Sequence, residues 1–150
     1  MQVNIFYKTA VPQKFKKSAL FKNAVLLSLG KSAPRDGVVN VVFVPEKEIH
    51  KINKNFLGHN FVTDVVTFPY PYGAEDKKEP FGDIFICYKA AAQNAPLYGH
   101  SVLEEMLTYA AHGALHLAGM DDDTKKKRAA MDKKAELILK RILPGRFSKR

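Results

Sequence analysis

The sequence has little cysteine, no long apolar run and no glycine-rich loop, and each scarcity excludes a class of protein. Its one cysteine, Cys87, has no partner in the chain for a disulfide, so a reducing cytoplasm is the expected location. No apolar run approaches the roughly 20 residues of a membrane span, and the first residues lack the apolar region of a signal peptide. No glycine-rich loop follows an expected strand. We therefore expect a soluble protein without a membrane segment or a nucleotide cofactor.

Acidic residues are also scarce at both ends of the chain. The 24 lysines and arginines exceed the 15 aspartates and glutamates, for a formal charge of +9, and residues 1–31 contain no acid. From Lys125 onward the only acids are Asp132 and Glu136. Such asymmetry favours RNA or DNA as a partner, because neutralised phosphates release counterions. A merely solubilising basic surface is the alternative.

Length and composition predict one domain over residues 1–150, since 46% of the residues are hydrophobic and the chain is long enough to bury a core. The patterns predict strands at 2–8, 37–44, 63–69 and 81–87, and helices from Pro12 to about Leu29, at 45–58, from Tyr88 to a break near 96–99, at 103–117 and at 124–139. We expect an α+β fold, in which a small mixed four-stranded sheet packs with about five helices. Residues 70–80 are expected to form a surface loop, and a loose basic tail to start at about residue 144.

The helix at 103–117 is apolar over so much of its surface that it is expected to be central and buried. His112 and His116 lie on it four residues apart, a spacing that lets two imidazoles bind one metal ion. Gly119 can end the helix in a left-handed conformation and turn the chain back, so that Asp122 reaches the same ion. The pattern predicts a His, His, Asp site with an open fourth position at the end of the central helix, as in catalytic zinc sites.

Two other interpretations of this segment remain open. The histidines can be ordinary helix residues, with the acidic run 121–123 capping the next helix. Alternatively, the aspartates can form a magnesium site, although a hard cation does not explain the histidines.

The pattern HxxxHxxGxxD also invites comparison with the HExxHxxGxxH motif of metalloproteases. Gly113 stands where those enzymes have their catalytic glutamate, so peptide hydrolysis lacks its usual proton acceptor. Cleavage of RNA does not depend on that carboxylate, because a 2'-hydroxyl or a metal-bound water can attack the phosphate.

Three segments together resemble the YbeY-type endoribonucleases. "HGALHLAGMDD" is similar to the family motif HGxLHLxGYDH, "INKNFLGHNFVTDVVTFPY" to LNxxyRxkdxPTDVLSFP, and "GDIFIC" to GDIvIs. The resemblance covers roughly residues 40–140. It implies a metal-dependent, single-strand-specific RNase that acts in rRNA maturation and ribosome quality control.

The resemblance implies that His112 and His116 match the first two zinc ligands and that Asp122 stands in place of the third histidine. A carboxylate remains an accepted zinc ligand, but it lowers the net charge of the site from about +2 to about +1. A bound water should then be less acidic, so we expect a more alkaline activity optimum than in relatives with three histidines.

Other positions depart from the family pattern in the loop before the third strand. The family arginine falls on Leu57, and the proline falls on Val62. His59 is a candidate replacement phosphate contact, and Thr67 occupies the family's serine position. Three consecutive lysines are further candidate RNA contacts: Lys125, Lys126 and Lys127.

The leading hypothesis is therefore an endoribonuclease with one zinc ion, acting on single-stranded RNA in rRNA or ribosomal particles. No side chain is an evident general base, so a metal-bound water is the default nucleophile activator, with the 2'-hydroxyl as the competing attacker. The alternative is a ribosome-assembly factor with structural zinc, which a fourth ligand from Cys87, His59 or His100 would favour. A metalloprotease is the third hypothesis.

Overall fold

The computed structural model describes residues 1–33, 36–57, 65–69 and 80–144 of the chain. Within these residues, the strands are β1 (Gln2–Tyr7), β2 (Val38–Val44), β3 (Val65–Pro69) and β4 (Pro80–Cys87). The α-helices are α1 (Ser18–Leu29), α2 (Glu46–Leu57), α3 (Tyr88–Asn94), α4 (Val102–Leu117) and α5 (Lys125–Ile142), and short 3-10 turns are η1 (Gln13–Phe15), η2 (Gly30–Ser32) and η3 (Ala95–Tyr98). The predicted α+β class with five helices is confirmed.

The strands form one sheet in the order β1-β2-β4-β3. The first three in that order are parallel, and β3 lies antiparallel to β4 at the edge. β1 and β2 are joined through α1, because parallel neighbours need a long crossover connection. The apolar, β-branched run of β2 explains its central place, since a central strand is covered on both faces.

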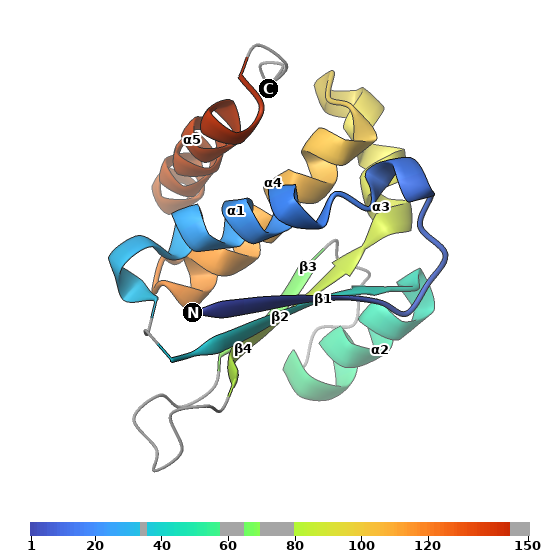
Figure 1. Ribbon diagram of the computed structural model, residues 1–150, viewed down its shortest axis with the longest axis horizontal. Coiled ribbons are helices and arrows are strands. Elements are labelled where there is room, and N and C mark those ends of the chain that lie inside the picture. The colour runs from blue at the N-terminus through green and yellow to red at the C-terminus, as the bar shows by residue number, and fades with distance from the viewer. Residues whose placement is uncertain (34–35, 58–64, 70–79, 145–150) are drawn as a thin grey trace.

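The helices cover both faces of the parallel strands, as Figure 1 shows. Phe21 of α1 and alternate β2 residues such as Val41 belong to the main core, which also contains most of α4. Ile49 of α2 packs on the opposite face, in a separate cluster with Val44 and Cys87. The loops after β1 and β2 therefore lead to opposite faces of the sheet.

The predicted central, buried helix is α4. Its start is closed by a capping box in which the Ser101 hydroxyl accepts from the Glu104 N–H and the Glu104 carboxylate accepts from the Ser101 N–H. Gly113 brings the helix close to β4, because a Cβ there would lie 2.6 Å from Cγ2 of Ile84. This explains why a glycine stands at the position of the metalloprotease glutamate: the position faces the sheet, and no larger side chain fits.

Two predicted helix boundaries were wrong. The helix expected from Pro12 begins at Ser18, since residues 13–15 form η1 instead. Tertiary contacts hold that turn, because the Phe15 ring packs 6.0 Å from the Tyr88 ring, centroid to centroid. The last helix continues beyond Leu139 to Ile142, and its first residue is Lys125. Leu139 lies on the apolar face of α5 and packs in the core, and the helix continues past it to Ile142.

Most of the loop expected at 70–80 and of the basic tail expected from residue 144 lies outside the described residues. Among the residues that are described, no helix combines the length and apolarity that crossing a membrane requires.

Candidate metal centre

The end of α4 turns the chain sharply, as the glycine predicted. Gly119 has φ +99°, and a Cβ at this position would meet no atom of the described residues within 4 Å, so the backbone conformation is what demands the glycine. The Gly119 N–H donates to the His116 carbonyl and the Met120 N–H donates to the Leu115 carbonyl, which together make a Schellman motif. The turn leads the chain back toward the last turn of α4 and places Asp122 beside His116.

His116 is oriented by this same turn. Its Nδ1 lies 3.1 Å from the Met120 carbonyl oxygen. A carbonyl can only accept, so Nδ1 carries the proton and Nε2 of the neutral ring carries the lone pair. Nε2 lies 3.5 Å from Asp122 Oδ2. A backbone carbonyl on one ring nitrogen is the arrangement that prepares the other nitrogen for a metal.

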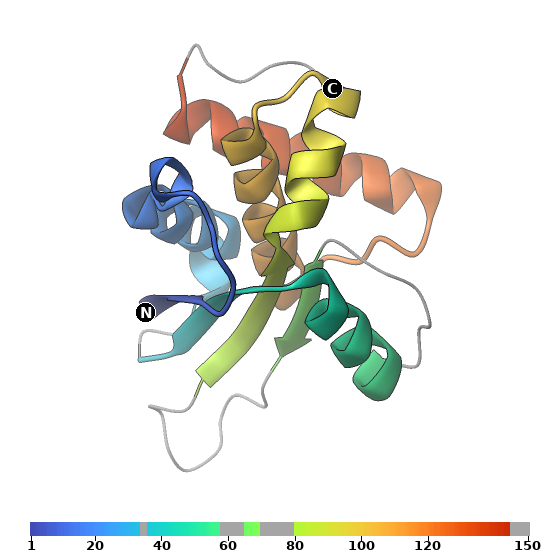
Figure 2. The same cartoon turned by 90° about the vertical axis from the view of Figure 1, so that its right-hand side faces the viewer.

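His112 lies one turn earlier and faces α5. Its Nε2 is 3.1 Å from Asp132 Oδ1, yet this buried atom makes no hydrogen bond within the part of the chain that the structure describes. Figure 2 shows α5, in orange to red, crossing behind α4, and the two helices are in contact. Sequence reasoning missed Asp132 as a member of the site. The signal available in the sequence was that Asp132 is one of only two acids on a helix that is otherwise rich in lysine.

The aspartate run does not cap α5. Thr124 does so instead, since its hydroxyl accepts from the Lys127 N–H at 3.1 Å. Lys127 also lies 3.2 Å from Asp123 and 3.9 Å from Asp121 through its ammonium group. Asp122, whose own carbonyl accepts from Arg128, is thus the member of the run whose carboxylate is directed toward a histidine.

The remaining predicted contacts are only partly placed. Thr67 pairs with Ile84 across β3 and β4, so it lies on the face of the sheet that carries α4. Lys125 and Lys126 are exposed at the start of α5, whereas Lys127 is engaged by aspartates. His59 and Val62 lie outside the described residues, as does the side chain of Leu57.

Over residues 1–33, 36–57, 65–69 and 80–144, no three histidine, cysteine, aspartate or glutamate side chains are grouped closely enough to hold a metal as they stand. The donors are arranged instead as two adjacent pairs, His112 with Asp132 and His116 with Asp122. The donor types and the orphaned His112 nitrogen fit zinc, which prefers imidazole nitrogen and carboxylate oxygen.

Two of the residues considered as a fourth ligand lie elsewhere. Cys87 is buried with Val44 and Ile49 on the α2 face of the sheet, where burial raises the pKa of its thiol. His100 precedes α4, at the opposite end from His116, and its Nδ1 lies 3.3 Å from the buried Glu105 carboxylate. Neither residue therefore favours a closed, structural zinc site.

The fold and the paired histidines define an α+β protein with a candidate metal centre at the end of its central helix. The family model described as Endoribonuclease YbeY matches residues 4–143. The chain is 57% identical over 143 residues to an Endoribonuclease YbeY of Elusimicrobium minutum, with 95% of this chain and 100% of that protein covered. The chain belongs to the YbeY endoribonuclease family.

A more distant relative carries the same family name, and a solved structure is similar in sequence and fold. An Endoribonuclease YbeY of Chlorobaculum parvum is 35% identical over 124 residues, which cover 83% of this chain and 85% of that protein. A solution structure of a Thermotoga maritima protein is similar at a TM-score of 0.57 and 30% identity, covering 97% of this chain and 96% of that one.

Proposed function

We propose that this protein is a zinc-dependent endoribonuclease that cuts single-stranded RNA in the cytoplasm, in rRNA maturation and ribosome quality control. Membership in the YbeY family supports the nuclease activity. The observation that carries the metal dependence is the His116 ring, whose Nδ1 is held by the Met120 carbonyl while Nε2 is directed toward Asp122.

Three side chains would hold one zinc ion: His112, His116 and Asp122. The bound ion would stabilise negative charge on the scissile phosphate and make a bound water more acidic. The buried α4 fixes the positions of His112 and His116 one turn apart, and the Schellman turn brings Asp122 next to His116.

The surroundings of the site suit a phosphate backbone. Lys125 and Lys126 are exposed just after Asp122 and would contact phosphates, while Lys127 neutralises the flanking aspartates. Thr67 and His59 are further proposed RNA contacts. Since the carboxylates near the histidines are accounted for as donors or ion-pair partners, no side chain is assigned as the general base.

Cleavage of an end-labelled single-stranded RNA by zinc-loaded protein tests the proposal. His116→Ala, carried through the same purification, is the control, and a duplex of the same sequence tests strand preference. We expect the wild type to cut the single strand and the variant to lose at least a hundredfold in rate, as removal of a metal ligand implies. Products ending in a 2',3'-cyclic phosphate would identify the 2'-hydroxyl as the attacker.

Equal cutting by both proteins would attribute the activity to contamination and contradict the proposal. If neither protein cuts while the wild type binds rRNA, the alternative of a zinc-containing assembly factor takes its place. Hydrolysis of casein without RNA cleavage would favour the metalloprotease.

A further inference from the structure

A cavity of about 450 Å³ lies outside the carboxyl ends of the parallel strands, apart from the candidate metal centre. Residues from the ends of two strands and the starts of two helices form its wall. Its lining includes Thr9, Val44, Glu46, Lys47, Tyr88 and Lys89. Its size falls within the range of small-ligand pockets, roughly 300 to 1,000 Å³.

The topology explains why a cavity forms at this place. β1 and β2 are adjacent and parallel, but the chain leaves β1 toward α1 on one face and leaves β2 toward α2 on the other. The departing loops diverge and leave a crevice between them. Thr9 follows β1, Val44 ends β2, and both line the cavity. In open parallel sheets, such a switch point is the usual place for a ligand.

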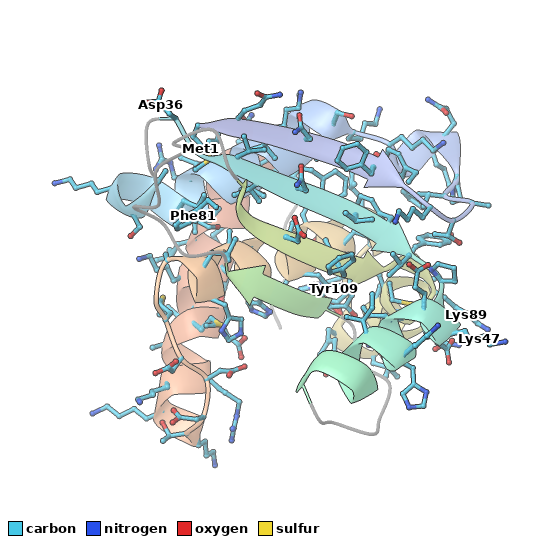
Figure 3. All side chains as sticks on the ribbon, turned by 90° about the horizontal axis from the view of Figure 1, so that it is seen from below. Met1, Asp36, Lys47, Phe81, Lys89 and Tyr109 are labelled. Atoms are coloured by element: carbon cyan, nitrogen blue, oxygen red, sulfur yellow. The ribbon has the colours of Figure 1, made fainter. Side chains whose placement is uncertain are left out.

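Cationic and aromatic side chains converge on this crevice. Figure 3 shows Lys47 and Lys89 at the same corner, opposite the end of the sheet where Met1 and Asp36 lie. Lys89 is 3.6 Å from the Glu46 carboxylate, and Lys47 lines the same cavity, so the described part of its wall carries two ammonium groups and one carboxylate. Tyr88 also lines the cavity.

The neighbouring surface extends the same chemistry. Phe15 packs against the Tyr88 ring, and the Lys14 ammonium lies 5.1 Å from the Phe15 ring centroid. These residues belong to the segment 1–31, which contains no acid. Aromatic rings beside cations suit a nucleotide, whose base stacks while its phosphate pairs.

We propose that this cavity binds a nucleoside monophosphate unit, with its base against Tyr88 and its phosphate at Lys47 and Lys89. The unit can come from a single-stranded RNA or from a free nucleotide. Assigning it to substrate RNA rests on the proposed function, whereas the nucleotide chemistry rests on the cavity alone.

The test is a titration of the metal-free, full-length protein, monitored through its amide chemical shifts by NMR. The probes are AMP, adenosine and a short 2'-O-methyl oligoadenylate, which lacks the 2'-hydroxyl needed for self-cleavage. We expect AMP to shift the amides of residues 44–50 and 88–89 saturably, and adenosine to bind more weakly. Lys47→Ala combined with Lys89→Ala should weaken AMP binding by roughly tenfold or more, since charged hydrogen bonds to the phosphate are lost.

The matched control is Lys31→Ala combined with Lys140→Ala, which removes the same charge from exposed positions outside the cavity. The proposal is overturned if the amides of residues 44–50 and 88–89 respond to neither AMP nor the oligomer. It is also overturned if the two double variants weaken AMP binding equally, or if hexaglutamate gives the same shifts. If the oligomer binds and AMP does not, the nucleotide unit comes from RNA. If AMP also binds, a free nucleotide is a source as well. Because no cleavage is measured, failure here leaves the nuclease assay unaffected.

Discussion

At the candidate metal centre, contacts from a few residues determine which nitrogen of His116 carries the proton and what the other nitrogen faces. The Met120 carbonyl assigns the proton of His116 to Nδ1, and Asp122 stands at the other nitrogen. The resemblance to the family motif implies that Asp122 stands in place of a third histidine. The acidity of a zinc-bound water depends on the charge of its ligands, so this one residue has a measurable consequence.

Asp122→His should shift the rising limb of the pH–rate profile to lower pH, on the order of one unit. Neutral imidazole in place of a carboxylate raises the net charge of the site from about +1 to about +2, which favours the deprotonated form of a bound water. The measurement compares wild type and variant at saturating zinc. Coincident profiles, or a shift to higher pH in the variant, would contradict the charge argument.

Asp132→Ala should weaken zinc binding by roughly tenfold, because its carboxylate lies 3.1 Å from the His112 nitrogen and its negative charge attracts the cation. Isothermal titration with zinc measures the change. Asp123→Ala removes the same charge from a residue paired with Lys127 and is the control. If the Asp132 variant binds zinc as tightly as wild type or more tightly, the carboxylate competes with the metal for His112 rather than assisting it.

At the scale of elements, the residues of the candidate metal centre come from α4, from α5 and from the turn between them. A rigid, buried helix holds both histidines, a Schellman turn reverses the chain, and α5 then supplies Asp132. The turn has a specific backbone requirement, since Gly119 has φ +99°. Gly99, at φ +69° before α4, has the same requirement away from the histidines.

Gly119→Ala and Gly99→Ala should each lower the free energy of unfolding by about 1 kcal/mol, because both positions are open in space but demand a left-handed backbone. Only Gly119→Ala should also reduce zinc affinity, by roughly severalfold, since it disturbs the carbonyl that orients His116. Urea unfolding and zinc titration separate the two effects. Equal zinc affinities for both variants would show that the turn does not preorganise the site.

Secondary-structure elements were predicted well where a single sequence pattern, such as apolar content or a glycine, dominates a segment. The burial of α4 and the left-handed turn at Gly119 followed from apolar content and glycine placement, and both are confirmed. The start of α1 was wrong, because Phe15 packs on Tyr88, a residue more than seventy positions away. Local propensity carries no information about such a contact.

For the whole molecule, the net charge of +9 determines how RNA should be bound. Affinity for an uncleavable single-stranded RNA should fall steeply with added salt, with a negative slope of log affinity against log salt of about 0.7 per neutralised phosphate. Fluorescence anisotropy over a salt series, with chloride and glutamate salts compared, gives the slope. A slope near zero would contradict binding through the basic surface.

The sequence by itself determined the α+β class, the central helix and the presence of paired histidines followed by glycine and aspartate, because these are encoded in local periodicity and spacing. Only the tertiary structure decided that Asp132 meets His112, twenty positions earlier in the chain. Tertiary structure also decided that divergent loops leave a cavity after β1 and β2. The reason is physical: each of these features joins residues distant in the chain, and their meeting depends on how the helices pack on the sheet.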